Sequence, residues 1–210
     1  EFSQKSARIF RAEQLKNLEI KNPERYADRL MNAMQKELRL DRQPRHIECF
    51  DNSNLQGSHP VASCVVFRDG KPSRKEYRHF NIKTVEGPDD YASMREVVFR
   101  RYTRLMAEGA ELPDLIIADG GKGQMGVIHE VLERLGLDIP IAGLAKDDRH
   151  RTAELLCGFP PLLVGIRPTS PLFHFLSQIQ EEVHRFAIAF HRQKRSKAFI
   201  HSELEQIEGI

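Results

Sequence analysis

Hydrophobic and polar positions alternate with different periods along this chain, and the changes of period predict its elements. Apolar runs of strand length, separated by Gly, Pro, Asn and Asp, predict three consecutive strands at 46–51, 61–67 and 75–82. A loop is expected at 56–60, and the pair Asp69 and Gly70 predicts a tight turn before the third strand. These three strands are therefore expected to form an antiparallel meander.

The pattern downstream of the meander alternates between helix and strand. Helical spacing of apolar residues predicts helices at 88–109, 124–135 and 171–190, and apolar runs predict strands at 115–119 and 139–145. A short hairpin is expected within 155–166. The resulting order, three antiparallel strands followed by alternating helix and parallel strand, is the arrangement of the ribonuclease H-like α/β fold.

The first 44 residues precede this pattern and predict a helical arm or linker. Asn22 and Pro23 form a good helix start, and Leu30, Met31, Met34 and Leu38 then recur at helical spacing. Pro44 separates this helix from the first strand. We therefore expect an arm over 1–44 and one main domain over 45–200.

Two of the predicted strands end in an aspartate. Asp51 follows the apolar positions of the first strand, and Asp119 follows the fully apolar run at 115–118. Ligands and catalytic groups collect at strand ends in open α/β sheets. Two carboxylates in one crevice repel each other unless a cation lies between them, and carboxylate ligands suit Mg²⁺ or Mn²⁺. The pair therefore predicts a divalent metal site.

Composition narrows the class of protein without deciding it. Lys plus Arg number 32 and Asp plus Glu 30, so the net charge is +2. The three cysteines form no Cys-x-x-Cys pair, which argues against a zinc site or a disulfide framework. No stretch approaches the ~18 apolar residues of a membrane span, and no signal peptide is evident. These features favour a soluble cytoplasmic protein.

Four sequence blocks carry a family resemblance. They are HIECFDNSN at 46–54, VEGPDDYASM at 85–94, LIIADGGKGQ at 115–124 and HRFAIAFHRQKRSK at 184–197. In this order they resemble the C-terminal endonuclease domain of UvrC, the incision subunit of bacterial nucleotide excision repair. The segment LEQIEGI at 204–210 resembles the start of the helix-hairpin-helix region that follows this domain, so 201–210 is assigned to that region and the chain is expected to be a fragment.

The resemblance implies a function and a site. It implies a metal-dependent endonuclease that makes the 5′ incision beside a lesion in double-stranded DNA presented by a UvrB–DNA complex, and a domain that acts as a monomer. The family's catalytic and metal-binding group maps onto Asp51, Asp119 and His184, and a further acidic position maps onto Asp89 or Asp90. Asn52 departs from the family pattern, which commonly has a branched apolar residue there; it could hydrogen bond near the site or face solvent.

Basic residues near these positions are candidates for binding DNA through its phosphates. A cluster follows His184 directly, and a lysine lies in the glycine loop after Asp119; these residues are Lys122, Arg192, Lys194, Arg195 and Lys197. Arg100, Arg101 and Arg104 could extend the track. Phosphate contacts hold DNA without recognising its sequence, as an enzyme that cuts at any sequence requires.

Other interpretations of the same residues stay open. An aspartate at a strand end is commonly a turn former or a helix cap, and a histidine on an apolar helix is commonly structural. His191 shares a helix face with His184, and spacing alone does not separate them. Gly121, Gly123 and Gly126 match G-x-G-x-x-G, which favours a nucleotide- or dinucleotide-binding domain. A ribonuclease H-like module that binds DNA or protein without cutting is a third hypothesis.

Overall fold

The computed structural model describes residues 9–10, 13–14, 17, 21–53, 61–85, 87, 89–146 and 152–205. Side chains are described within these ranges except at 53, 146, 152, 153, 191 and 193–205. The loop predicted at 56–60 lies outside the described residues.

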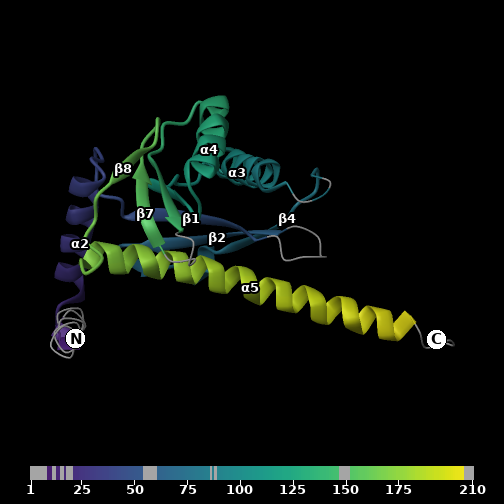
Figure 1. The fold of residues 1–210 in the computed structure, drawn as a ribbon. Coiled ribbons are helices and arrows are strands. Elements are labelled where there is room, and N and C mark those ends of the chain that lie inside the picture. The colour runs from purple at the N-terminus through teal and green to yellow at the C-terminus, as the bar shows by residue number, and fades with distance from the viewer. Residues whose placement is uncertain are drawn as a thin grey trace.

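One mixed sheet organises the described part of the chain (Figure 1). Its strands are β1 (His46–Ser53), β2 (Val61–Arg68), β3 (Lys71–Pro72), β4 (Arg78–Asn81), β5 (Leu115–Ala118), β6 (Ile141–Lys146), β7 (Thr152–Cys157) and β8 (Leu162–Val164). The order across the sheet is β3-β2-β1-β5-β6-β7-β8, and β4 also pairs with β2. β1 pairs antiparallel with β2 and parallel with β5, which pairs parallel with β6. This is the predicted ribonuclease H-like arrangement, extended by the antiparallel hairpin of β7 and β8.

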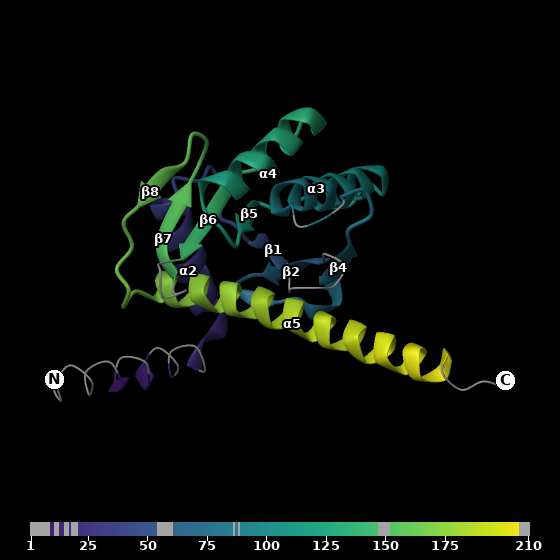
Figure 2. The same ribbon diagram turned by 45° about the vertical axis from the view of Figure 1, so that its right-hand side comes forward.

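Helices cover both faces of the sheet (Figures 1 and 2). They are α2 (Pro23–Glu37), α3 (Asp90–Ala107), α4 (Lys122–Leu135) and α5 (Pro171–Glu205). α3 and α4 lie side by side on one face, and their apolar residues form one buried cluster with Phe50 and Ile116. α5 crosses the other face and forms a second buried cluster with Ile47 and Ile117. The alternation of side chains along each strand therefore divides the core into two halves.

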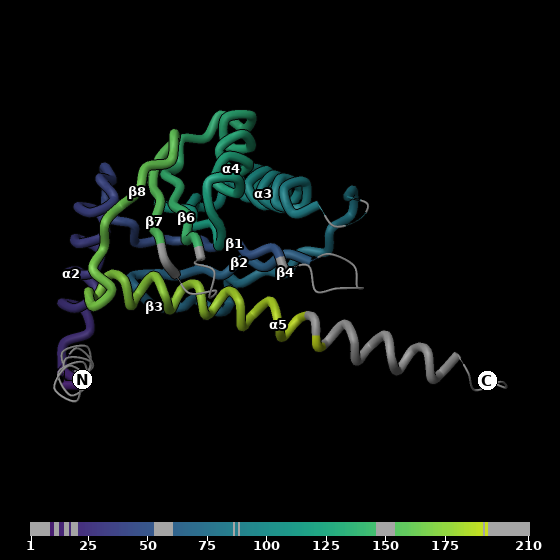
Figure 3. Tube along the Cα trace, viewed as in Figure 1, coloured from purple at the N-terminus to yellow at the C-terminus, as the bar shows by residue number. Residues whose placement is uncertain are grey.

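The N-terminal helix packs onto the body of the protein. Asn22 caps α2 by accepting a hydrogen bond from the backbone N–H of Arg25 at 3.5 Å, as the sequence predicts. Leu30, Met31 and Met34 are buried in the same cluster as the first residues of α5. Figure 3 shows α2 beside the start of α5, at the end of the sheet away from β4. The division of the chain at residue 44 stays a prediction.

The third strand predicted at 75–82 is confirmed as β4, which pairs antiparallel with β2, but the structure starts it later and adds a separate short piece, β3, before it. Asp69 and Gly70 form the expected turn with positive φ values of 51° and 77°, but the strand after it ends at Pro72. Proline has no N–H for the ladder, and a 3₁₀ turn at Arg74–Glu76 follows before β4 resumes pairing with β2. The third strand is therefore two short pieces.

The last helix is longer than predicted. α5 spans 35 residues and continues past 190 and through 200 without interruption. The proposed boundary at 200 thus falls inside a helix, and residues 206–210 lie outside the description. Across the described residues, none of the helices combines the length and the apolar character that crossing a membrane requires.

Candidate active site

The two predicted aspartates lie at the ends of adjacent parallel strands. Phe50 pairs with Ala118 in the β1–β5 ladder, and the N–H of Asp119 donates to the carbonyl of Phe50 at 2.9 Å. Asp51 and Asp119 are the next residues of their strands, and neighbouring strands lie about 4.8 Å apart. The two backbones therefore place both carboxylates at one edge of the sheet.

Both carboxylates also point to the same face. Ile47, Cys49 and Ile117 belong to the cluster beneath α5, and side chains two residues apart share a face of a strand. Asp51 and Asp119 follow in that alternation. Asp51 is buried, with 6% of its surface exposed. The pair thus lies between the sheet and α5.

One face of α5 contacts both aspartates. The amide nitrogen Nε2 of Gln180 donates to Oδ1 of Asp119 at 2.5 Å and to the carbonyl of Leu144 at 3.4 Å. One turn later, Nδ1 of His184 lies 3.7 Å from Oδ2 of Asp51. The side chain of His184 is 54% exposed, so its imidazole lines the open side of the crevice. The structure therefore brings together Asp51, Asp119 and His184.

Aromatic contacts fix the rotation of α5. The ring of His79 on β4 stacks between Phe186 and Phe190, with centroid distances of 3.7 and 4.1 Å. Nε2 of His79 also lies 3.1 Å from the carbonyl oxygen of Phe186. Phe186 and Phe190 are one turn apart on α5, so their stacking on His79 sets the rotation of the helix. That rotation directs His184 toward the aspartates.

Several shielded oxygens surround the crevice. Oδ1 of Asn52, Oγ of Ser63 and Oε1 of Gln124 have no hydrogen-bond partner among the described residues. Ser63 lies directly opposite Asp51 in the β1–β2 ladder, and the side chain of Gln124 lies over Gly120, next to Asp119. Buried polar atoms normally have partners. These atoms indicate that water, an ion or a substrate completes the site.

The donor set suits a hard divalent cation. Within the described ranges, no three His, Cys, Asp or Glu side chains already form a metal cage. Mg²⁺ does not need one, since it usually keeps several waters and binds through one or two carboxylates. Asp51 and Asp119 could hold such an ion, with His184 at the edge of its coordination shell.

Comparison with known proteins places this arrangement in a family. The model of the UvrC RNase H endonuclease domain matches residues 35–188, most of the chain. The chain belongs to this family.

Curated relatives of this UvrC domain are similar over most or all of its length. It is 60% identical to the UvrABC system protein C of Bacteroides fragilis over 210 residues, all of this chain and 34% of that protein. It is 61% identical to that of Streptococcus uberis over 174 residues, which are 82% of this chain and 29% of that protein. The chain thus spans about a third of the length of these relatives.

Solved structures show weaker similarity. Ciona intestinalis endonuclease V in complex with DNA containing an inosine followed by a ribo-adenosine is 16% identical, with a TM-score of 0.38, over 56% of this chain and 57% of that one. Human endonuclease V is 11% identical, with a TM-score of 0.39, over 82% of this chain and 98% of that one.

The acidic residues before α3 have different positions. Oδ1 of Asp89 accepts from the N–H of Ala92 at 2.9 Å and so caps α3. Asp90 is exposed, and its carbonyl accepts from Nδ2 of Asn52 at 2.6 Å. Asn52 therefore hydrogen bonds beside the site, and it ties the start of α3 to the end of β1.

The candidate DNA-binding residues are described in part. Lys122 is the first residue of α4 and is exposed, and Arg192 is exposed on α5. The side chains of Lys194, Arg195, Lys197 and the alternative histidine His191 lie outside the described residues. Their roles stay predictions.

Placing Arg101 in the DNA track was wrong. Nη2 of Arg101 lies 2.6 Å from Oε1 of Glu48, and the two side chains are 11% and 0% exposed. Arg100 and Arg104 lie nearer the surface but pair with Glu96 of α3 and with Glu108, the residue that caps its C-terminal end. Arg101 therefore stabilises the core between β1 and α3.

Glu48 is the centre of a buried polar network on the α3 side of β1. The hydroxyl of Tyr102 donates to its Oε2 at 2.9 Å, and Nε2 of His46 lies 3.5 Å from its Oε1. Burial raises the pKa of Glu48, but the bonds from His46, Arg101 and Tyr102 outweigh burial and lower it. The carboxylate is therefore charged in the core at neutral pH.

The dinucleotide hypothesis does not fit the fold. β1 and β2 are antiparallel, whereas a dinucleotide-binding half is built on parallel strands. Gly123 has a different use, because a Cβ there would collide with the ring of Tyr91. Gly123 therefore serves the contact between α3 and α4, whereas a Cβ at Gly126 would meet nothing within 4 Å.

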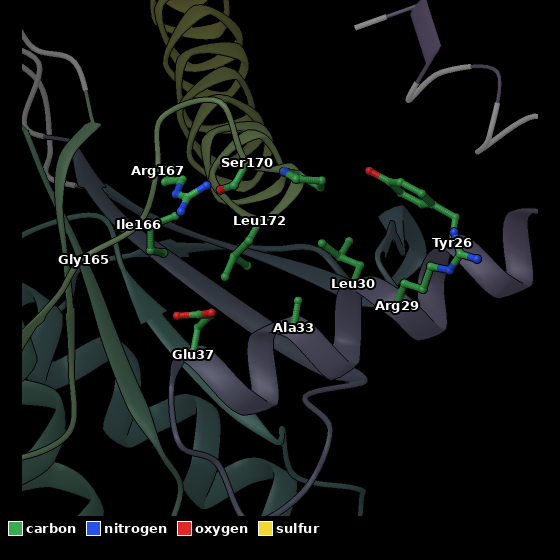
Figure 4. A pocket seen from close by; sticks show the side chains of 11 residues that line it. Tyr26, Arg29, Leu30, Ala33, Glu37, Gly165, Ile166, Arg167, Ser170 and Leu172 are labelled. Carbon is green, nitrogen blue, oxygen red and sulfur yellow. The ribbon is translucent and has the colours of Figure 1, made fainter. Parts of the chain in front are cut away.

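A separate pocket of about 610 Å³ lies between α2 and the segment before α5 (Figure 4). Tyr26, Arg29 and Glu37 of α2 line one side, and Ile166 and Arg167 line the other. Neither aspartate lines it. The candidate active site is instead the open crevice at the ends of β1 and β5.

Sequence patterns did not single out Gln180 and Ser63. Gln180 precedes His184 by four residues, so helical spacing alone could have placed it on the same face. Ser63 could be found only from the register of β2 against β1, which its own sequence does not display.

Gln180 offers a test of the arrangement. We expect Gln180→Leu to lower DNA cleavage about 10- to 100-fold, the usual loss when the partner of a metal-binding side chain is removed. The reason is that Asp119 loses the donor that orients it. Single-turnover kinetics measures the cleavage rate, and denaturant unfolding checks the stability of the variant. Gln178→Leu on the exposed side of α5 is the matched control and should cleave normally. A normal rate for Gln180→Leu would contradict the orienting role.

Proposed function

We propose that this domain is the metal-dependent DNA endonuclease that makes the 5′ incision beside a lesion in nucleotide excision repair. The observation that carries the proposal is the convergence of Asp51 and Asp119 on one face, each contacted from α5. Membership of the UvrC family supports an endonuclease, and the chemistry of the two carboxylates supports a metal site.

The proposed site divides the work of phosphodiester hydrolysis among its residues. Asp51 and Asp119 would hold Mg²⁺ or Mn²⁺, which would supply positive charge for the phosphoryl group and for activating water. Gln180 would orient Asp119. His184 has the exposure to serve as a further ligand or to transfer a proton. Asp90, at the start of α3, is a candidate for a further acidic contact.

The proposed substrate is damaged double-stranded DNA presented in a UvrB–DNA complex. Lys122 and Arg192 are exposed on the two helices that flank the crevice, and Lys194, Arg195 and Lys197 continue the basic run along α5. Cations of this kind hold phosphates without selecting bases. We further propose a helical arm over 1–44, a monomeric nuclease domain over 45–200 and the start of a following region over 201–210.

Removing the metal tests the function directly. We expect a chelator to abolish cleavage by the full-length protein acting with its UvrB–DNA complex, and Mg²⁺ or Mn²⁺ to restore it. The ion should also stabilise the folded domain, by about 2.7 kcal/mol at a concentration 100 times its dissociation constant, because it binds only the folded site. Thermal unfolding with and without Mn²⁺ measures that effect.

The double variant Asp51→Asn/Asp119→Asn is the control for unfolding, and Mn²⁺ should leave its transition unchanged. Cleavage that persists in chelator would contradict metal dependence. DNA binding without cleavage under any metal would favour the inactive binding module instead.

A further inference from the structure

Tyr91 is an exposed aromatic side chain beside the aspartate crevice. It occupies the first turn of α3, and 52% of its surface is exposed. Tyr102, on the same helix, is completely buried. About half of its surface is therefore available to a partner.

The ring of Tyr91 rests on the first turn of α4. A Cβ at Gly123 would meet the hydroxyl oxygen of Tyr91 in a clash, and would lie 2.8 Å from both Cε1 and Cζ of the ring. Only glycine leaves this space. One edge of the ring is therefore held against α4 while the rest faces solvent, which lowers the entropy lost when a flat partner stacks on it.

Both partners of the contact between Tyr91 and Gly123 are linked to the segments that carry the aspartates. Asn52, directly after Asp51, donates to the carbonyl of Asp90 at 2.6 Å, and Asp90 precedes Tyr91. Gly123 follows Asp119 by four residues, in the first turn of α4. The cap from Asp89 to Ala92 fixes the same turn of α3. Tyr91 is thus tied to both sides of the crevice.

We propose that Tyr91 is a stacking platform for a nucleobase next to the scissile phosphate. This inference rests on the proposed nuclease function and adds a contact that positions the strand to be cut. Every base has a flat face, so stacking tolerates any sequence, as do the phosphate contacts. Stacking on one aromatic ring strengthens binding about 5- to 150-fold.

Substitution separates stacking from a structural role. In the full-length protein, Tyr91→Leu should raise KM or the DNA dissociation constant about 5- to 150-fold, and Tyr91→Phe should stay near wild type. Met106→Ala, at an exposed position near the other end of α3, is the control and should change neither. Gly123→Ala should reproduce the loss, because the added methyl displaces the ring of Tyr91 rather than backbone. Thermal unfolding checks that each variant is folded.

A modified substrate identifies the stacked group. An abasic nucleotide is placed at each position flanking the scissile phosphate. At one of these positions, the abasic nucleotide should lower the DNA affinity of the wild-type protein as much as Tyr91→Leu lowers the affinity for normal DNA. Tyr91→Leu should then bind the abasic DNA no more weakly than it binds normal DNA. Quenching of 2-aminopurine at that position should disappear in Tyr91→Leu.

Other outcomes would overturn the inference. Normal KM and binding for Tyr91→Leu, or losses that add at every position, would show that Tyr91 does not stack on a base. Absence of cleavage by the wild-type protein would instead contradict the nuclease function, so the two failures are distinguishable.

Discussion

Replacing Asp51 or Asp119 with asparagine is expected to lower the rate of DNA cleavage by about three orders of magnitude or more. A bound divalent ion supplies several kcal/mol of transition-state stabilisation, and about 4 kcal/mol corresponds to a factor of roughly 10³ in rate. Asparagine keeps the shape of the side chain but removes the charge that holds the ion. Single-turnover cleavage of lesion-containing DNA measures the loss.

The folded state should tolerate these substitutions. Asp51 and Asp119 lie side by side at adjacent strand ends, so removing one charge relieves repulsion in the metal-free protein. Denaturant unfolding without metal should therefore give equal or higher stability for each variant. Asp138→Asn, at an exposed position after α4, is the control and should leave cleavage unchanged. Substantial cleavage by both single variants would remove the two-aspartate site from the mechanism.

Replacing Glu48 with leucine is expected to destabilise the fold by about 3–5 kcal/mol, because Arg101 is then left as a buried charge without its partner. The hydroxyl of Tyr102 loses its acceptor as well. Denaturant unfolding at pH 7 measures the change. The double variant Glu48→Leu/Arg101→Leu should lose less than Glu48→Leu alone, since an apolar pair avoids the cost of one isolated charge. A double variant as unstable as the sum of both single changes would contradict this account.

The contribution of Glu48 should also depend on pH in a defined direction. Its pKa in the folded protein is below the ordinary value of 4.5. Its charged form therefore stabilises the fold above pH 4.5, and that stabilisation is lost as the pH falls through the lowered pKa. The difference in unfolding free energy between wild type and Glu48→Gln should be full at pH 7 and shrink below pH 4.5. A difference that is constant down to acid pH would show that Glu48 is not held ionised by its partners.

The sequence predicted the fold where the physical signal is local. The apolar run before Asp119 and the alternation before Asp51 indicate strands, because successive side chains of an extended backbone point to opposite faces of the sheet. The same reasoning missed the short β3 at Lys71–Pro72 and began the third strand too early, because a 3₁₀ turn at Arg74–Glu76 precedes β4. It also ended α5 too early, since local spacing does not show how far a helix continues.

The sequence alone did not show which basic residues are exposed and which are buried. Arg101 and Lys122 are both cations in helices near the crevice, but only Lys122 is exposed. The difference comes from Glu48, which lies 53 residues before Arg101 in the chain. A partner at that separation is set by the pairing of elements, which the local sequence does not specify.

The sequence by itself determined the type and order of the main helices and strands, the two aspartates at strand ends and the family resemblance, because each depends on residues close together in the chain. Tertiary structure alone decided that Gln180 and His184 reach the aspartates from α5, that Glu48 and Arg101 form a buried pair, and that Tyr91 lies on Gly123. These contacts depend on register and helix rotation, which arise only when the whole sheet and its covering helices pack together.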